Sequence, residues 1–574
     1  MSRPAAHGRV RVGAVLIALI LALTGCTGLP TSGEVFPGLE PGAAPDEPPA
    51  QYYAVAPTRG ATPEQIVNGF IEAAISPLDG WETARLFLGG DFAGSWRPEA
   101  GVIVDAADAR ELQVDEEAGR VTLTVTPTAT VDEHGSYATS SSGPIELSFR
   151  LAQRDDGEWR IVEAPEGIVL DQQQFPDVYS DHALQYFDPT WTYLVPDVRW
   201  FPASGNTATY VVRELVNGAP SAWLSGSVAS AFGQDIKLDP DAVPVDTDGV
   251  AHVGLNAVAA GADATALGRM MTQLTQSLAN ADVRDVRLTI AEQPDSVVDV
   301  EPVPTAQTRP DSRPLVLRSG EFGLLSGGDL TPIDGLSDVI EDMAGTINVI
   351  AVAPDQQTAA VRQSTGIVYR VTAESPDQVD AERDDLIPPM IDPFGYVWTA
   401  PEDDPTAIRA WDPDLEPIPI TGGLGDATSV REMAMSRDGT RVAALVTSGG
   451  QHVAVVASVR RDRTGRPTGL SEATRTTVLP HPGVSIAWIE DTRIGIVTGE
   501  DDTWYVVEQQ VGGPSERSVA PTDTTTIEYG TADSAVRLRG ADGLLYVRRG
   551  SSWQQTGAEV SVLATQMGTP QGAD

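Results

Sequence analysis

The sequence has little of what most catalytic and metal-binding proteins depend on. It contains one cysteine in 574 residues, which excludes internal disulfides and any zinc or iron–sulfur site built from several thiolates. Its six histidines are scattered, and no two lie at the helical spacing of a metal-ligand pair. The HExxH, GxSxG, Walker A, SxxK and EF-hand patterns are absent as well. We therefore predict that the chain is not an enzyme and binds no cofactor or metal.

Basic residues are also scarce. Lys and Arg total 38 against 81 Asp and Glu, which gives a formal net charge of -43. A chain this acidic repels polyanions, so binding to nucleic acid is not expected. It also repels an anionic membrane surface, so any membrane contact has to come from something other than basic patches. We read the acidity as a means of solubility rather than as an acidic binding surface.

Long apolar runs are missing except for one near the N-terminus, at residues 12–23. About 20 residues are needed to span a bilayer, and this run of about a dozen follows a basic segment, as the apolar region of a secretory signal does. It ends in Leu23, Thr24, Gly25 and Cys26, which resembles the bacterial lipobox, in which a peptidase cuts before a lipidated cysteine. We predict a signal peptide at 1–25 and a Cys26 carrying an S-diacylglycerol and an N-linked palmitoyl group. The alternative is a free cysteine closing an uncleaved anchor.

The residues after the cysteine are rich in proline and glycine. Such a composition is typical of flexible chain with extended stretches, so residues 26–61 are predicted to be a lipidated tether. Two acyl chains give stable anchoring where one is marginal. The predicted localisation is therefore the extracytoplasmic face of the cell membrane, held by lipid.

The first folded unit is predicted at 62–175 as an α+β domain. Thr62 is placed to cap a helix that starts at Pro63. Alternating strand patterns follow at 120–127, 145–153 and 159–163. Helices followed by antiparallel strands define the α+β class, and this order is similar to the cone-shaped folds of the nuclear-transport-factor-2 (NTF2) type.

A second, small α/β domain is predicted at 189–302, followed by a proline-rich linker at 303–314. Its clearest element is an amphipathic helix over 263–280, with Asp263 as the cap. Strands are predicted at 250–255 and 284–291. Met270 and Met271 lie on the apolar face of the helix, and we interpret them as core packing rather than a binding groove.

From 315 to 565 helical periodicity vanishes and short strands alternate with turns. The turn elements recur at intervals of about 40 to 50 residues, near Asp355, Phe394, Asp438, Asp491 and Ser534. This spacing predicts a β-propeller of about six blades, with the strand pair at 544–555 closing the ring. The alternative is an open pair of β-sandwiches. Acidic residues of separate strands could converge in a central channel, which linear sequence does not reveal.

Six longer strings carry a resemblance to a known family: LTGCTGLPTSG, TPEQIVNGFIEAA, FDPTWTYLVPDVRWFP, RELVNGAPSAWL, PPMIDPFGYVWTA and SRDGTRVAAL. Together with the domain order, they make the chain similar to the LpqB family of actinobacterial lipoproteins over essentially its full length. The third and fourth strings look like the start of a GerMN domain, and the last two like propeller blades. One turn departs from the family: Ala353-Pro354-Asp355-Gln356 stands where the family has Ser-Pro-Asp-Gly, which puts the geometry of that turn in doubt.

The resemblance implies an accessory role. Members of this family are associated with the MtrAB two-component system, and the expected partner is the extracytoplasmic domain of an MtrB-like sensor histidine kinase. No binding residues carry over. Two other functions remain open on the residues alone: binding of cell-wall glycan or peptide, and a metal-dependent propeller hydrolase with acids in the channel.

Overall fold

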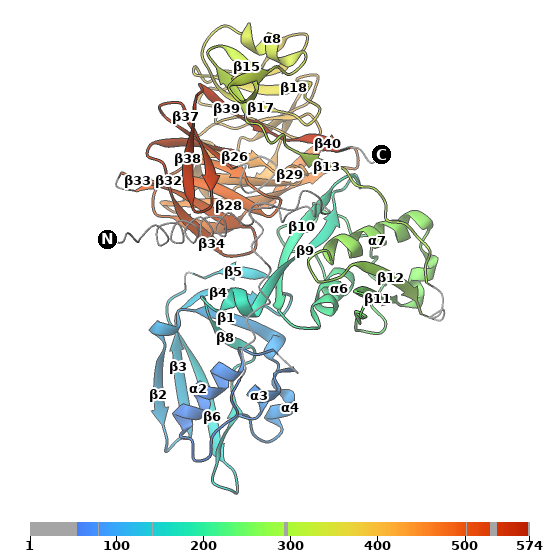
Figure 1. The fold of residues 1–574 in the computed structure, drawn as a ribbon, viewed down its shortest axis with the longest axis vertical. Coiled ribbons are helices and arrows are strands. Elements are labelled where there is room, and N and C mark those ends of the chain that lie inside the picture. Colours follow the sequence, from blue (N-terminus) through green and yellow to red (C-terminus); the bar gives the residue numbers. More distant parts are fainter. Residues whose placement is uncertain are drawn as a thin grey trace, which may run out of the picture. The chain divides into compact units, whose positions relative to one another are not determined.

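The computed structural model describes residues 54–77, 80–140, 142–291, 297–500, 502–528 and 536–571. The predicted signal peptide, the lipobox of Leu23, Thr24, Gly25 and Cys26, and most of the tether lie outside these ranges. Within them, no helix has the length and apolar character that crossing a membrane requires. Figure 1 shows the order of elements along the chain, which begins with a helix-led domain and ends in a domain built almost entirely of strands.

The N-terminal domain opens with α2 (Pro63–Ala73). The Thr62 hydroxyl accepts a hydrogen bond from the Gln65 backbone, and the Gln65 side chain accepts one from the Thr62 backbone, which completes a capping box. The other helical segments are α3 (Glu82–Arg85), α4 (Phe92–Ser95), Pro98–Ala100, Ala107–Ala109 and α5 (Phe175–Val178). The helix start predicted at Thr62 is confirmed.

Two four-stranded sheets complete this domain, in the orders β5-β4-β1-β8 and β2-β3-β6-β7. The strands are β1 (Gly101–Asp105), β2 (Glu111–Asp115), β3 (Arg120–Val125), β4 (Pro127–Asp132), β5 (Tyr137–Thr139), β6 (Ile145–Gln153), β7 (Trp159–Glu163) and β8 (Ile168–Asp171). Buried and exposed positions alternate along β3, β4 and β6, because successive side chains of a strand point to opposite faces. An α+β domain is therefore confirmed.

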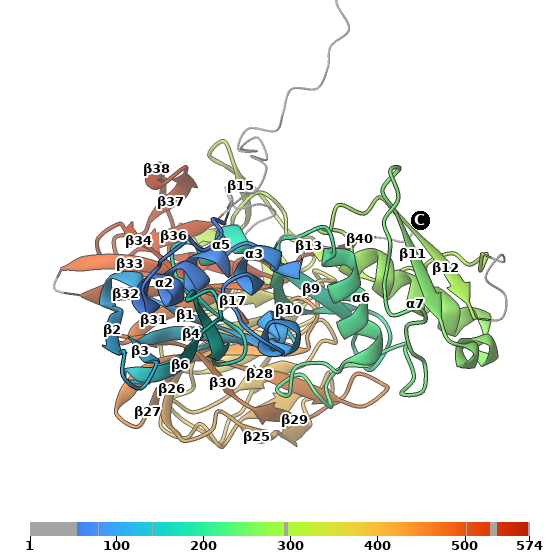
Figure 2. The ribbon, with the colours of Figure 1, turned by 90° about the horizontal axis from the view of Figure 1, so that it is seen from below.

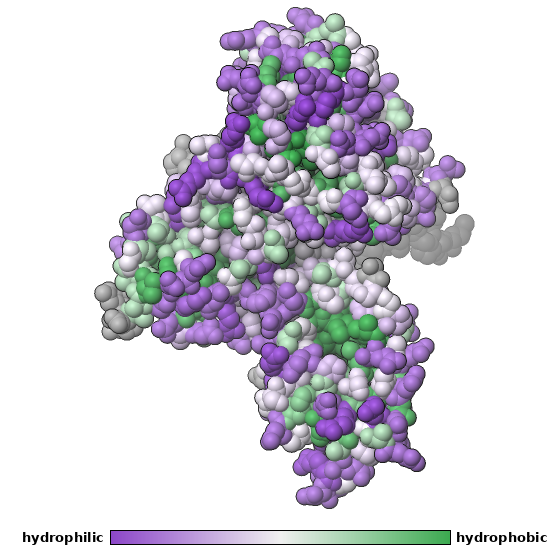
Figure 3. Space-filling view, turned by 180° about the vertical axis from the view of Figure 1, so that it is seen from behind, coloured by the Kyte–Doolittle hydropathy of each residue, from purple (hydrophilic) through white to green (hydrophobic). Residues whose placement is uncertain are grey.

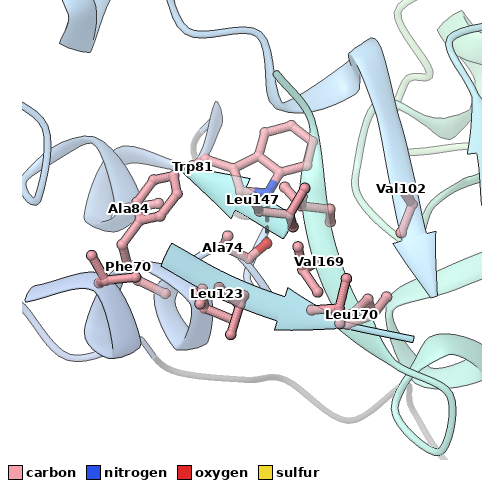
Figure 4. Packing of buried hydrophobic residues seen from close by; sticks show 14 of the residues in the cluster. Phe70, Ala74, Trp81, Ala84, Val102, Leu123, Leu147, Val169 and Leu170 are labelled. Carbon is pink, nitrogen blue, oxygen red and sulfur yellow. Dashed lines mark hydrogen bonds between the residues drawn. The ribbon is translucent and has the colours of Figure 1, made fainter. Parts of the chain in front are cut away.

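The core of this domain lies between α2 and the sheets (Figure 4). Phe70 of α2 packs edge-to-face on Trp96, with ring centroids 5.0 Å apart. Trp81 is 3% exposed and donates its indole N–H to the Ala74 carbonyl over 2.9 Å. Leu123 of β3 packs in the same cluster. Aromatic side chains bury large apolar areas, so this core fixes α2 on the sheets.

A long hairpin, β9 (Tyr179–Phe187) and β10 (Leu194–Pro202), follows. Its two faces belong to different cores. Trp200 packs in the core of the N-terminal domain, whereas the neighbouring Phe201 packs in that of the second domain. Alternation along a strand allows this division. β9 occupies much of the interval 176–188 that the sequence-based boundaries left unassigned.

The second domain contains α6 (Thr207–Asn217), β11 (Val250–Leu255), a 3-10 turn (Ala257–Gly261), α7 (Ala264–Ser277) and β12 (Asp285–Ile290). β11 and β12 pair in parallel. α7 contacts both β9 and β12 (Figure 2). The Asp263 carboxylate accepts from the Ala266 backbone over 2.8 Å, and Met270 and Met271 are 1% and 6% exposed. The predicted cap and the interpretation of the Met pair as core are both confirmed.

The C-terminal domain is built of mainly antiparallel sheets, in which β17 with β39 and β25 with β29 pair in parallel. Their paths are β16-β15-β14-β39-β17-β18-β19-β20, β21-β22-β23-β24, β26-β27-β28 with β30 and with β29-β25, β31-β32-β33-β34 and β35-β36-β37-β38. The first strands are β13 (Gln307–Arg309), β14 (Leu315–Arg318), β15 (Glu321–Ser326), β16 (Asp329–Thr331), β17 (Ile347–Val352), β18 (Thr358–Gln363), β19 (Val368–Thr372), β20 (Pro376–Val379), β21 (Met390–Ile391), β22 (Val397–Thr399), β23 (Arg409–Trp411), β24 (Pro417–Pro419) and β25 (Thr421–Gly423). The remaining strands are β26 (Ala427–Met435), β27 (Arg441–Ser448), β28 (Gln451–Arg461), β29 (Pro467–Glu472), β30 (Thr474–Leu479), β31 (Gly483–Trp488), β32 (Arg493–Glu500), β33 (Thr503–Gln510), β34 (Ser515–Ala520), β35 (Thr524–Glu528), β36 (Arg537–Gly540), β37 (Leu544–Arg549), β38 (Ser552–Glu559), β39 (Val562–Gln566) and β40 (Thr569–Gln571).

Most of the predicted turns fall where the spacing placed them. Asp355, Phe394, Asp438 and Asp491 each lie in the turn between two successive antiparallel strands, namely β17 and β18, β21 and β22, β26 and β27, and β31 and β32. Ser534 is outside the described residues. In the turn at Asp355, Gln356 adopts φ 54°, the left-handed conformation that glycine adopts most easily. The turn that lacks the family's glycine therefore keeps a left-handed residue at that position.

Two expectations for this domain were wrong. A helix, α8 (Leu336–Glu341), lies between β16 and β17. Leu336 and Ile340 bury one face of this helix, but its six residues are too few to show helical periodicity in the sequence. The pair at 544–555 does not close the domain. It forms β37 and β38, at the end of one sheet, while β39 pairs with both β14 and β17. β39 is the strand suited to an interior position, because Val562, Leu563 and Ala564 are all buried.

Asp392, in the string IDPFGYVWTA, forms a buried ion pair with Arg461. Asp392 and Arg461 are both fully buried, and their closest N and O atoms are 2.7 Å apart. Arg461 also donates to the Gly439 and Gly465 carbonyls, and its guanidinium lies 4.5 Å from the Phe394 ring centroid. A buried charge is tolerated when it is paired and fully hydrogen-bonded, so the ion pair fastens β28 to the turn after β21.

Candidate functional site

The β9–β10 hairpin holds a polar network at the junction of the first two domains. Arg199 and Asp197 are 3% and 2% exposed in their side chains and form an ion pair of 2.8 Å. Arg199 also donates to the His134 carbonyl and the Ser136 hydroxyl, each over 3.1 Å. Asp197 accepts from the backbone and the hydroxyl of Ser221, over 2.8 and 2.7 Å. Burial opposes the charge of Arg199, but Asp197 raises the pKa of the guanidinium overall. The network of Arg199 and Asp197 ties both domains to the hairpin.

The same region is bonded to the C-terminal domain. The Trp200 indole donates to the Gly512 carbonyl over 2.9 Å, and the Gln510 amide donates to the Asp181 carboxylate over 2.6 Å. Between β9 and β10, Tyr193 packs edge-to-face on Phe394 of the C-terminal domain, with ring centroids 5.9 Å apart. Further along the second domain, the Trp223 carbonyl and the Ser227 hydroxyl contact the hydroxyl of Ser458, a residue of the C-terminal domain, over 2.6 and 2.7 Å. One hairpin therefore contacts all three domains.

The C-terminal domain encloses a cavity of 310 Å³. Most of its lining comes from the strands β17, β21, β26, β31, β35 and β39, and Arg362 of β18 and Arg539 of β36 also line it. This places the cavity where those strands converge. Its charged lining residues carry both signs: Arg362, Glu432, Arg437, Glu528 and Arg539. A cavity of this size lies at the lower end of the range for small-molecule sites.

We call this cavity the channel. The two carboxyl groups that line it, those of Glu432 and Glu528, have raised pKa values. Burial, and then the charge of Glu528, raise the pKa of Glu432 to about 8, while the Ser485 hydroxyl contacts it at 3.3 Å. Burial raises the pKa of Glu528 to about 7, opposed by a hydrogen bond from the Thr565 hydroxyl. Desolvation disfavours the charged form of a carboxyl, so both acids keep their protons to a higher pH than an exposed glutamate does. A cationic group that entered the cavity would favour their charged forms.

Burial lowers the pKa of Arg362 in the same channel, and its buried Nε has no hydrogen-bond partner among the described protein atoms. The channel can therefore offer groups of both signs to a small zwitterionic ligand. Glu432 and Glu528 were not singled out from the sequence. The sequence shows only one acid in each of the strings VREMAM and TTTIE. These acids become a candidate site only when the folded chain brings their strands together.

The remaining candidates of the sequence do not gather into a catalytic group. Across the described ranges, no set of three or more His, Cys, Asp or Glu side chains is placed to hold a metal ion. His134 and His252 instead face single carboxylates, Glu214 at 3.1 Å and Asp246 at 2.9 Å. Hydrogen bonding to Glu214 raises the pKa of His134.

Large apolar side chains that the structure exposes are spread along the described residues. Large exposed apolar side chains occur in all three domains, at positions such as Val55, Leu86, Val258 and Val519. On the face drawn in Figure 3, hydrophilic residues surround separate hydrophobic areas. Scattered exposed apolar residues are normal for a folded protein, so they do not by themselves mark a docking surface.

Family comparisons match the three domains in turn. Residues 56–176 match the model "Lipoprotein LpqB, N-terminal domain", 183–296 the model "Sporulation and spore germination", and 320–562 the model "Lipoprotein LpqB beta-propeller domain". The chain belongs to the LpqB lipoprotein family. The middle match is the Germane, or GerMN, domain expected from the sequence.

Curated LpqB lipoproteins from several actinobacteria align over nearly the whole chain. The protein from Streptomyces coelicolor is 26% identical, over 95% of this chain and 96% of its own length. The Rhodococcus opacus protein is 26% identical over 93% and 94% of the two chains, and the Bifidobacterium longum protein 25% identical over 96% and 98%. These matches extend the LpqB family resemblance across all three domains.

Solved structures resemble only part of this LpqB-family chain. TolB from Acinetobacter baumannii is 15% identical with a TM-score of 0.33, over 43% of this chain and 64% of its own. A nidogen/laminin complex chain is 7% identical with a TM-score of 0.30, over 42% and 91%. TM-scores of this size do not establish a common fold.

Proposed function

We propose that this LpqB-family chain is a non-enzymatic, lipid-anchored modulator of an envelope sensor histidine kinase of the MtrAB type. In this proposal Cys26, acylated after cleavage of residues 1–25, holds the protein on the extracytoplasmic face of the cell membrane. The three domains then act as binding surfaces beside the extracytoplasmic part of an MtrB-like kinase. Confinement at one membrane raises the effective concentration of each protein for the other.

The observation that supports this proposal is the shared β9–β10 hairpin. Its Trp200 belongs to the core of the first domain and donates to Gly512 of the third. Its Phe201 belongs to the core of the second. Binding at one domain can affect another only through elements that both contact. A hairpin that contacts all three is suited to a protein that passes on a binding event rather than one that catalyses a reaction.

The proposal is tested by crosslinking in intact cells. The unaltered protein is compared with Cys26→Ala, which is exported without lipid, and with Trp200→Phe, which keeps the lipid but lacks the bond to Gly512. We expect the sensor kinase among the products of the unaltered protein, and a reduced yield with Cys26→Ala. Recovery of no sensor kinase from any of the three would overturn the proposal.

A second function, binding of a cell-wall glycan or peptide, is favoured by the channel. Its mixed charges at Arg362, Glu432 and Glu528 suit a peptide bearing both ammonium and carboxylate groups. The test is retention of the purified protein on purified cell wall. Saturable retention without any other protein, lost in Glu432→Gln with Glu528→Gln, would favour this function. Retention that is equal in the variant would count against the channel.

We also infer that the C-terminal sheets form a closed six-bladed propeller. The inference rests on the lining of one cavity by β17, β21, β26, β31, β35 and β39, and on the pairing of β39 with β14. An experimental structure of the domain tests the blade count directly. The likeness of the N-terminal domain to the NTF2 type stays a prediction.

A further inference from the structure

A second cavity, of 420 Å³, lies where the first domain meets the Germane domain. It is lined by the residues after α2, the end of α5, the start of β9, the loop between β10 and α6 with the start of α6, Val245, and the residues after α7. Its volume corresponds to on the order of a dozen water molecules at ~30 Å³ each. It also falls within the range of small-molecule sites, which occur preferentially between domains.

His182 of β9 lines this cavity and is 3% exposed. Neither ring nitrogen has a hydrogen-bond partner among the described protein atoms. The ring stacks on Phe201, with centroids 6.2 Å apart and planes at 29°. His134 and His252, by contrast, each face a carboxylate. Buried polar groups are nearly always hydrogen-bonded, so an exception calls for an explanation.

Burial lowers the pKa of His182, which leaves the imidazole neutral near pH 7 with one N–H donor and one acceptor lone pair. Burying such groups without partners opposes folding. This loss of folding free energy is explained if the unpaired nitrogens form hydrogen bonds with a bound ligand. The position of His182 in a cavity, rather than in close-packed core, gives such a ligand room.

The charges of the cavity lining indicate what kind of ligand would fit. Asp177 and Asp282 contribute carboxylates, Ser180 and Ser204 contribute hydroxyls, and neither lysine nor arginine is among the lining residues. Anions are therefore disfavoured. Ammonium and hydroxyl groups, which donate hydrogen bonds, match this lining.

We propose that this cavity binds a small amine-bearing polyol, of the amino-sugar class, and that His182 supplies hydrogen bonds to it. The carboxylate of Asp282 attracts the ammonium group, while the imidazole contacts a hydroxyl. The site shares no lining residue with the cavity of the C-terminal domain. Ligand binding by the purified chain can be measured without a kinase, so the two proposals can fail separately.

The test is titration of the soluble chain, residues 27–574, with three probes of similar size: glucosamine, glucose and glucuronate. Binding is followed by calorimetry and by the ¹⁵N signals of the histidine rings, which report directly on His182. We expect saturable binding of glucosamine, at least tenfold weaker binding of glucose, and none of glucuronate. Equal binding of all three probes, or no binding of glucosamine at millimolar concentration, would overturn the proposal.

His182→Phe keeps a ring against Phe201 and removes both nitrogens. Without ligand its Tm should rise by about 2–4 °C, because no polar group is left unpaired. Its affinity for glucosamine should fall at least about tenfold. His252→Asn, which alters a histidine outside the cavity in the same domain, should change neither the affinity nor the ring signals of His182. Unchanged affinity in His182→Phe would refute the role of the imidazole.

Asp282→Asn provides a second variant that does not alter the core. Asp282 adopts φ 54°, a conformation that asparagine also tolerates. The variant should lose the preference for glucosamine over glucose while still binding both. A retained preference would contradict the role given to Asp282.

Discussion

Asp392→Asn should destabilise the C-terminal domain strongly, although it replaces one buried side chain by another of the same size. Asp392 is fully buried. One carboxylate oxygen accepts from the Phe394 and Tyr396 backbones, each over 3.0 Å. The other accepts from the Trp398 indole over 2.9 Å and the Arg461 guanidinium over 2.7 Å. Every donor around this group therefore points at a negative charge.

The cost of the change follows from the second oxygen. An asparagine oxygen can still accept from the two backbone N–H groups, but its NH₂ then faces the donors of Trp398 and Arg461. Both donors lose their acceptor, and the buried guanidinium loses its counter-charge. Breaking a buried ion pair from one side costs about 3–5 kcal/mol, a large part of the ~5–15 kcal/mol that stabilises a typical domain. Arg461→Met added to Asp392→Asn should restore part of this loss, because it removes the unpaired charge.

Urea unfolding followed by tryptophan fluorescence measures this effect, since Trp398 lies at the site. Asp412→Asn is the matched control. Asp412 also accepts from two backbone N–H groups of a turn, those of Asp414 and Glu416, but it has no buried arginine beside it. The control should lose no more than about 0.5 kcal/mol. A loss below about 1 kcal/mol in Asp392→Asn would refute the assignment of the charge as the stabilising element.

Three further predictions concern the anchor, the domain junction and the channel. Cys26→Ala should move the protein from the membrane to the soluble fraction with an unchanged Tm, and a lowered Tm would contradict a purely anchoring role. Trp200→Phe should cost about 1 kcal/mol for the lost hydrogen bond to Gly512 and should separate the calorimetric transitions of the domains, whereas a single unchanged transition would show that this bond does not couple them. The pKa of Glu432 is raised from 4.5 to about 8, so the folded chain keeps this proton to a higher pH than the unfolded chain. The carboxyl therefore lowers the stability of the fold progressively as pH rises through this window. Glu432→Gln should show a smaller fall in Tm from about pH 5 to about pH 8, and an identical fall would refute the buried position of the acid.

The elements best predicted from the sequence are those determined by local chemistry. Thr62 and Asp263 cap the helices that follow them because their side-chain oxygens reach backbone N–H groups a few residues away. The exposed and buried positions of β6 follow the alternation of its residues. The propeller turns were predictable for the same reason, since Asp392 and Asp438 accept from the backbone two residues on.

Features that depend on long-range pairing were missed or misplaced. β39 completes the sheet of β14 across more than two hundred residues, and nothing in its five residues states which strand it joins. α8 is too short for a periodic signal. The channel acids lie on different sheets, and His182 is polar in a strand that otherwise alternates normally. For β39, the channel acids and His182, the groups they contact are distant in sequence, so only the folded chain brings them together.

The position of β39 bears on how the protein is made. Residues 562–566 provide the strand that β14 and β17 both pair with, and Gln566 bonds to the backbone on either side of Ser312. During synthesis the N-terminal segments leave the ribosome first, so β14 emerges long before β39 can pair with it. Until then the apolar edge of β14 is open to pairing with other strands. Rapid folding of the intervening sheets would protect that edge, and a truncation that removes only residues 562–566 should yield a chain that aggregates after its synthesis is complete.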